Sequence, residues 1–140
     1  MNFCANEFLK QIINSKEPIR FFNTNKHIFQ DYNLKKHLLY LLESKSMSKS
    51  QTISASGINV TYAYHIFSGD KKPSRDKVLS LAFAFQLNLN ETQHLLRQSE
   101  SMELYLFNFR DAIIIHAISN GYSLMQTNNL LHELAENIIE

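Results

Sequence analysis

The placement of three glycines constrains this chain more than any other feature of its sequence. Only three glycines and two prolines occur in 140 residues, and each glycine directly follows a segment with helical apolar spacing. They are Gly57, Gly69 and Gly121. Helices commonly end where the next residue takes a positive φ, which glycine adopts without strain. Too few glycines and prolines remain for the many turns of an all-β protein or for a glycine-rich phosphate loop. We therefore predict an all-α fold.

Composition excludes several classes of protein. Hydrophobic residues make up 44% and charged residues 19%, which argues against disorder, and the length suits one compact domain. The single cysteine, Cys4, excludes an internal disulfide framework and an all-cysteine zinc site. No apolar run approaches the roughly 18 residues that would cross a bilayer, and no signal-peptide pattern opens the chain. We expect a cytoplasmic protein with no membrane partner.

Charge is distributed unevenly along the chain. The formal net charge is only +1. Residues 32–80 carry a net +5, whereas residues 81–140 carry a net −5. A basic segment in a neutral chain favours a surface that faces a polyanion such as nucleic acid, although a merely uneven surface would give the same counts.

Apolar periodicity divides the chain into three parts. Residues 1–30 form an N-terminal extension with a helix over about 3–14, which Pro18 ends or separates from a new segment. This extension also holds apolar residues that we expect to pack on the body of the protein or on a second copy: Phe21, Phe22, Ile28 and Phe29. Residues 31–99 form the central domain, and residues 100–140 a C-terminal helical extension.

Capping residues predict where the remaining helices begin and end. Asp31 is the predicted N-cap of the first central helix, and Ser74 caps a helix over 75–86. The other predicted helices cover 49–56, 60–68 (capped by Asn59), 91–99 (capped by Asn88 or Asn90), 111–119 and a last helix after Ser123. The inner side of that last helix is predicted to hold Leu124, Leu130, Leu131, Leu134 and Ile138.

Residues 48–69 form a helix, a glycine turn and a second helix with a polar N-terminus, which is the helix-turn-helix arrangement. Five small or apolar residues are expected to hold its two helices together: Ile53, Ile58, Ala63, Ile66 and Phe67. Five polar or aromatic residues are then left more exposed: Asn59, Thr61, Tyr62, Tyr64 and His65. The free N–H groups of an exposed helix N-terminus favour phosphate, and its first side chains can enter a major groove.

This segment and the next resemble the lambda-repressor-like (XRE) helix-turn-helix family. The second helix is followed by Phe67-Ser68-Gly69-Asp70-Lys71-Lys72-Pro73-Ser74-Arg75 and then by a helix of small and apolar residues, as in that family. The resemblance covers about residues 32–98 and implies a five-helix domain that binds double-stranded DNA, usually as a homodimer.

The resemblance also implies which residues contact DNA. Base contacts would come from Asn59, Val60, Thr61, Tyr62, Tyr64 and His65. Phosphate contacts would come from Lys49, Lys71, Lys72, Ser74 and Arg75. Ile53 departs from the alanine common at its position, and no Arg or Gln stands among the first exposed residues of the second helix. This favours an A·T-rich site, a weak sequence preference or a helix no longer used for DNA.

The remaining signals do not indicate catalysis. Six histidines are scattered without a recognised ligand spacing, so we expect no metal or other cofactor. We expect no enzyme activity, because no nucleophile–base or carboxylate pair can be located. We predict a sequence-specific transcriptional regulator, a repressor. The alternative is an accessory or antitoxin-like protein–protein interaction module that keeps the scaffold, with a partner bound through residues 1–30 or 100–140. Residues 100–140 either complete the core or form a dimer face.

Overall fold

The computed structural model describes residues 5–140 as helices joined by short links, and no strand occurs among them. The predicted all-α class is confirmed. Nine helices are described: α1 (Ala5–Asn14), α2 (Pro18–Asp31), α3 (Leu34–Ser44), α4 (Lys49–Ser56), α5 (Val60–Ser68), α6 (Arg75–Ala84), α7 (Leu89–Gln98), α8 (Phe109–Ser119) and α9 (Leu124–Glu133). Phe3, in the helix predicted over 3–14, and Cys4 lie outside the described residues.

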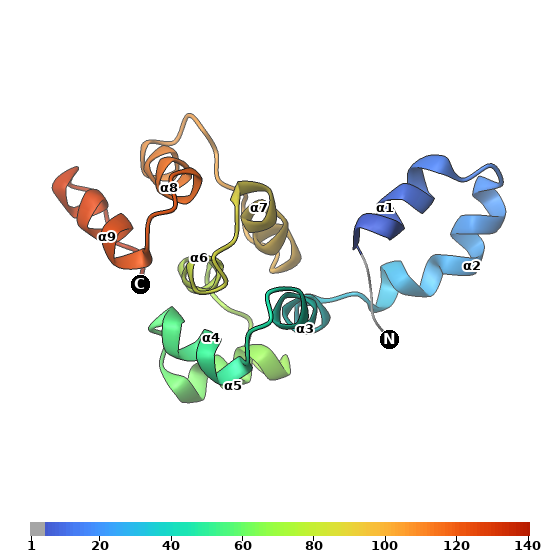
Figure 1. Cartoon of the computed structure of the whole chain (residues 1–140), viewed down its shortest axis with the longest axis horizontal. Helices are drawn as coiled ribbons and strands as arrows, with labels where there is room; N and C mark the ends of the chain where they lie inside the picture. The colour runs from blue at the N-terminus through green and yellow to red at the C-terminus, as the bar shows by residue number, and fades with distance from the viewer. Residues whose placement is uncertain (1–4) are drawn as a thin grey trace.

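Helix α6 is the centre of the core. It packs against α4, α7 and α9, while α3 contacts α5 and α7 (Figure 1). Its buried residues are Val78, Leu79, Ser80, Leu81, Ala82 and Ala84. A helix buried on nearly every side must contact helices all round it. The single core cluster runs from Leu38 in α3 to Leu131 in α9.

Short polar side chains cap the helices. Ser74 accepts a hydrogen bond from Lys77 N, and Asn88 and Ser123 form capping boxes with the third residue of α7 and of α9. These predicted caps are confirmed. The prediction for Asp31 is wrong, because Asp31 is the last residue of α2, and Asn33 caps α3 by accepting from Lys36 N at 3.0 Å. Pro18 is the first residue of α2, at position N1. That helix continues to Asp31, the residue that was expected to cap the next helix.

The N-terminal hairpin, α1 and α2, lies at one end of the molecule, drawn in blue in Figure 1. Ring contacts of Phe8 join its two helices, with centroid distances of 5.5 Å to Phe29 and 6.1 Å to Phe21. No residue of α2 is buried. The body of the protein therefore buries none of these apolar residues, and Phe21, Phe22 and Phe29 make ring contacts within the hairpin. The other expected partner, a second copy, stays a prediction.

The C-terminal helices complete the same core. Leu104, Ile113, Ile114 and Leu131 belong to the core cluster that α3–α7 build. Leu134 and Ile138, predicted on the inner side of the last helix, are 43% and 37% exposed. Helix α9 ends at Glu133, and Ala135 takes a φ of +59°, which turns the chain so that Ile139 is buried instead.

Two Arg–Asp dipeptides bind the C-terminal extension to α6 through crossed ion pairs. Arg75 donates to both carboxylate oxygens of Asp111, at 3.0 and 2.9 Å. Arg110 donates to both oxygens of Asp76, at 3.2 and 3.1 Å. We call these two pairs the Arg–Asp clamp. Bidentate charge-assisted pairs of this kind fix orientation as well as adding stability, so the clamp sets where α8 starts relative to α6.

A buried histidine secures the junction between α2 and α3. His37 is 3% exposed, its ring lies 4.7 Å from that of His94, and its Nδ1 is hydrogen-bonded to the Tyr32 hydroxyl at 2.5 Å. Burial, with a smaller contribution from His94, lowers the pKa of His37 from 6.5 to about 4. Burial raises the pKa of Tyr32 to about 12, with a further contribution from Tyr40, so its hydroxyl keeps its proton.

Protein stability is therefore expected to fall in mild acid. Below pH 6.5 the unfolded chain binds a proton at His37 that the folded chain does not bind until about pH 4. The free energy of unfolding should drop by about 2 kcal/mol between pH 7 and pH 5. Urea denaturation at both pH values measures this. His37→Phe should flatten the dependence, whereas His132→Gln, at an exposed position of α9, should not. An unchanged slope in His37→Phe would contradict the assignment.

Candidate nucleic-acid interface

Helices α4 and α5 form the helix-turn-helix unit expected from the sequence. Their bounds coincide with the predicted ones, and Gly57 between them takes a φ of +70°, which favours glycine. The residues expected to hold the helices together are all buried: Ile53, Ile58, Ala63, Ile66 and Phe67. These burial predictions are confirmed. One face of α5 is therefore committed to the core.

The opposite face of α5 points to solvent. Val60 is 58% and Tyr64 46% exposed, and Thr61 and His65 are exposed beside them. Tyr62 is half-buried, and its hydroxyl lies 3.5 Å from the carbonyl oxygen of Lys72. Five of the six predicted base-contacting residues thus lie on α5, and the sixth, Asn59, is its N-cap. Of the five, Tyr62 is directed to the turn that follows the helix.

Asn59 is also the N-cap of α5. Its side-chain oxygen accepts from Tyr62 N at 3.1 Å and caps α5. An asparagine reads adenine with its amide oxygen and nitrogen together. Because the cap bond occupies the oxygen, bidentate reading of adenine by Asn59 would require that bond to be shared or released.

Four lysines lie near the ends of α5 or beside its buried face. Lys71 and Lys72 follow the helix, and Lys49 starts α4 with its Nζ 5.8 Å from the centroid of the Phe67 ring. Lys35 of α3 is a residue that the sequence did not single out. Its side-chain carbons lie 3.8 and 4.0 Å from where a Cβ on Gly69 would stand. Only the packing of α3 on α5 brings Lys35 to this surface.

Arg75 is a correction to the expected phosphate contacts. Besides its two hydrogen bonds to Asp111, its Nε donates to Met102 O at 2.9 Å and its Nη2 to Glu103 O at 3.1 Å. Every nitrogen of the guanidinium is occupied within the chain. Ser74, also expected at phosphate, caps α6 with its hydroxyl. The local sequence could not reveal this, because Asp111 lies 36 residues further on.

Two carboxylates stand among the lysines. Asp70 accepts from the Ser68 hydroxyl at 3.0 Å and lies 3.5 Å from Nδ1 of His65. The Ser68 hydrogen bond, followed by that of His65, holds the pKa of Asp70 below its usual value. Glu100 pairs with Lys72 at 3.1 Å, with both side chains largely exposed. The surface is therefore basic but not uniformly so, and exposed pairs of this kind are worth little to stability.

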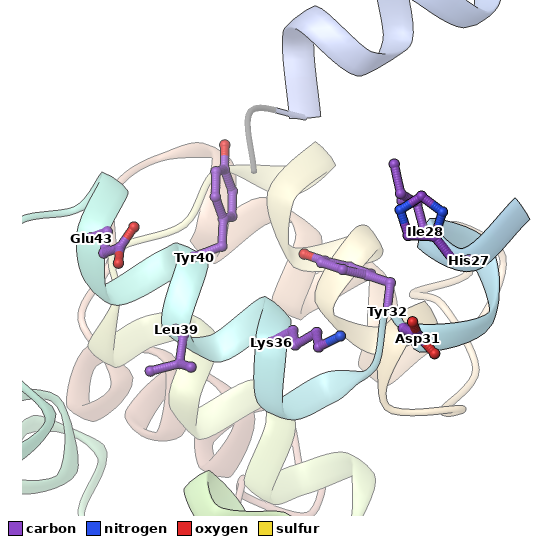
Figure 2. Close-up of a pocket in the computed structure, with 8 residues that line it drawn as sticks. All are labelled: His27, Ile28, Asp31, Tyr32, Lys36, Leu39, Tyr40 and Glu43. Carbon is purple, nitrogen blue, oxygen red and sulfur yellow. The ribbon is translucent and has the colours of Figure 1, made fainter. Parts of the chain in front are cut away.

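A groove of about 450 Å³ lies elsewhere, at the junction of α2 and α3. Figure 2 shows its lining, four residues from the end of α2 and the link and four from α3. They are His27, Ile28, Asp31, Tyr32, Lys36, Leu39, Tyr40 and Glu43. Acidic, basic and apolar side chains alternate there, so no single ligand chemistry is favoured.

The part of the chain that the structure describes contains neither a metal-binding cluster nor a membrane-spanning helix. No group of three or more His, Cys, Asp or Glu residues among residues 5–140 is arranged to hold a metal ion. None of the helices described is long and apolar enough to cross a membrane. Comparison of the chain with protein families, with characterised proteins and with solved structures finds no match.

Proposed function

We propose that this protein is a sequence-specific DNA-binding transcriptional regulator, a repressor, built on a lambda-repressor-like five-helix domain formed by α3–α7. Helix α5 enters the major groove. The observation that carries the proposal is the division of α5: Ala63, Ile66 and Phe67 bury one face, while Val60, Thr61 and Tyr64 leave the other open to solvent. A nine-residue helix that is anchored this way presents its N-terminal side chains to a partner.

Each part of this surface has a distinct role in the proposal. The methyl groups of Val60 and Thr61 suit the C5-methyl of thymine, and the Thr61 hydroxyl can hydrogen-bond to a base edge. Lys35, Lys49, Lys71 and Lys72 contact phosphate, which positions the protein without reading sequence. Arg75 is not among them, because the Arg–Asp clamp holds it.

Substitutions at the two kinds of residue should behave differently. Thr61→Ala should change the preferred sequence, lowering discrimination at one base pair by about 5- to 10-fold. Lys72→Ala should weaken binding to all sequences by a similar factor and reduce the magnitude of the salt slope by about 1 for each bound copy. Binding selection from random duplexes, followed by fluorescence anisotropy, measures both. Lys16→Ala, at an exposed lysine in the link between α1 and α2, is the matched control and should change neither. If the Thr61 and Lys72 variants behaved alike, the placement of α5 in the groove would be wrong.

A second function has one observation in its favour. Half of the open face of α5 is apolar or aromatic, through Val60 and Tyr64, and Asp70 and Glu100 neutralise part of the basic surface. A protein–protein interaction module that keeps the scaffold would present such a face to a partner helix. Elution from a heparin column at low salt, without retention on any duplex, would favour this alternative and reject the first.

A further inference from the structure

We propose that the N-terminal hairpin, α1 and α2, is a dimerisation element that pairs with the same hairpin of a second copy to form an intermolecular four-helix bundle. This inference goes beyond the proposed function and does not depend on DNA binding. It rests on three features of the hairpin: the width of its apolar stripes, the area they leave exposed and the balance of its charges.

The apolar stripe of each hairpin helix is twice as wide as one neighbouring helix can cover. Apolar residues occur there as adjacent pairs, of which the first member is half-buried and the second exposed: Phe8 and Leu9, Ile12 and Ile13, Phe21 and Phe22, Ile28 and Phe29. Neighbours in a helix point about 100° apart. One member of each pair thus turns inward within the hairpin, and the next turns outward along the same flank.

A four-helix bundle requires such a stripe, because each of its helices contacts two neighbours. The hairpin supplies one neighbour for each helix, through the rings of Phe8, Phe21, Phe22 and Phe29. Among residues 5–140, no second helix covers the rest of the stripe closely enough to bury a residue of α2. A second hairpin related by a twofold axis would supply that second neighbour to all four helices at once.

The exposed area is large enough for a specific dimer. Leu9 is 54%, Ile13 68%, Ile19 80%, Phe22 45% and Phe29 51% exposed. Together these side chains present on the order of 500 Å² in one copy. Two copies would bury about 1,000 Å², which is where specific interfaces begin.

Charge distinguishes the exposed apolar face of the N-terminal hairpin from that of the link between α7 and α8. The link between α7 and α8 also exposes large apolar residues, with Phe107 at 80% and Tyr105 at 58%. However, residues 100–140 carry six acidic residues and one basic one. Three of the acids pair with Lys72, Arg75 and Arg97, but the other three still leave a negative charge, so self-pairing would bring like charges together. The hairpin carries four basic and three acidic residues, so two copies can meet with little repulsion.

The mass of the full chain in solution, without DNA, tests the proposal. Light scattering behind gel filtration over about 1 to 100 μM should show a dimer. Phe22→Glu or Ile13→Glu should raise the dissociation constant at least about 100-fold, because either would bury a carboxylate in an apolar interface. Phe107→Glu is the matched control, an exposed aromatic outside the hairpin, and should leave the dimer intact.

A second measurement keeps the proposal testable if a glutamate variant unfolds the hairpin. The chain contains no tryptophan, so Phe22→Trp introduces a single reporter. Its emission should be blue-shifted in the dimer and shift to the red on dilution below the dissociation constant, whereas Phe107→Trp should emit as a solvent-exposed indole throughout. A wild-type monomer at every concentration, an open polymer, or a dimer lost only in Phe107→Glu would each overturn the proposal. A wild-type protein that forms the dimer but binds no DNA would overturn only the proposed function.

Discussion

Asp111→Ala is expected to lower the free energy of unfolding by about 3 to 5 kcal/mol, the usual result of removing one partner from a buried ion pair. The Asp111 side chain is 8% exposed and that of Arg75 28% exposed. Without the carboxylate, the Arg75 guanidinium would keep only its bonds to two carbonyl oxygens, and the N–H of Tyr105 would lose its acceptor, 3.0 Å away. Burial raises the pKa of Asp111, but the Arg75 and Tyr105 hydrogen bonds outweigh it and hold that pKa below its usual value.

A double-mutant cycle separates the pair from its surroundings. Urea denaturation of Arg75→Ala, Asp111→Ala and the double variant gives the coupling free energy between the two side chains. We expect the double variant to be less destabilised than the sum of the singles, because it leaves no buried charge unpaired. Asp70→Ala is the matched control, since that carboxylate is exposed. A loss of under about 1 kcal/mol for Asp111→Ala would show that the Arg–Asp clamp is not needed to hold α8.

DNA affinity is expected to fall by about 10⁴-fold when salt rises from about 50 to 200 mM, if a dimer places four lysines of each copy on phosphate. Each neutralised phosphate releases counterions, so the logarithm of affinity falls with the logarithm of salt at a slope near −0.9 per contact. The lysines are Lys35, Lys49, Lys71 and Lys72, all at the surface around α5. Anisotropy titrations with a labelled duplex containing the preferred site measure the slope.

Substitutions of basic residues should change the salt slope by different amounts. Removing Lys71 and Lys72 together should reduce the magnitude of the slope by about 4 in a dimer, or by about 2 in a monomer. Lys35→Ala should reduce it as well, which tests a contact that only the packing of α3 on α5 suggests. Arg75→Lys should leave the slope unchanged, because Arg75 is bound within the chain. An affinity that is flat between the two salt concentrations would contradict the DNA-binding proposal.

Local signals predicted helices α4 and α5 to the residue. Ser48 and Asn59 accept hydrogen bonds from N–H groups of their own helices, and Gly57 and Gly69 close those helices with positive φ. Other helices turn at residues whose type carries no such signal. Ser46 follows the end of α3 with a φ of +52°, Gln86 that of α6 with +56° and Glu100 that of α7 with +59°. The residue after each of them donates its N–H back into the helix, as Leu87 does to Ala82 O at 3.0 Å. These backbone bonds accompany a conformation that the side chains themselves do not favour.

Residues 48–69 determined their own structure through contacts made within a few positions, so the sequence alone was enough to predict the helix-turn-helix unit and its buried face. The contacts of charged and apolar side chains depend instead on which distant parts of the chain the fold places beside them. Arg75 lies in a basic turn along the sequence, but the tertiary structure pairs it with Asp111 of α8. Lys35 reaches the surface around α5 only because α3 packs there. The N-terminal phenylalanines were expected to pack on the body of the protein or on a second copy, and within the chain they contact one another in a hairpin. Periodicity reports which side of a helix is apolar, and only the arrangement of helices in space decides what covers it.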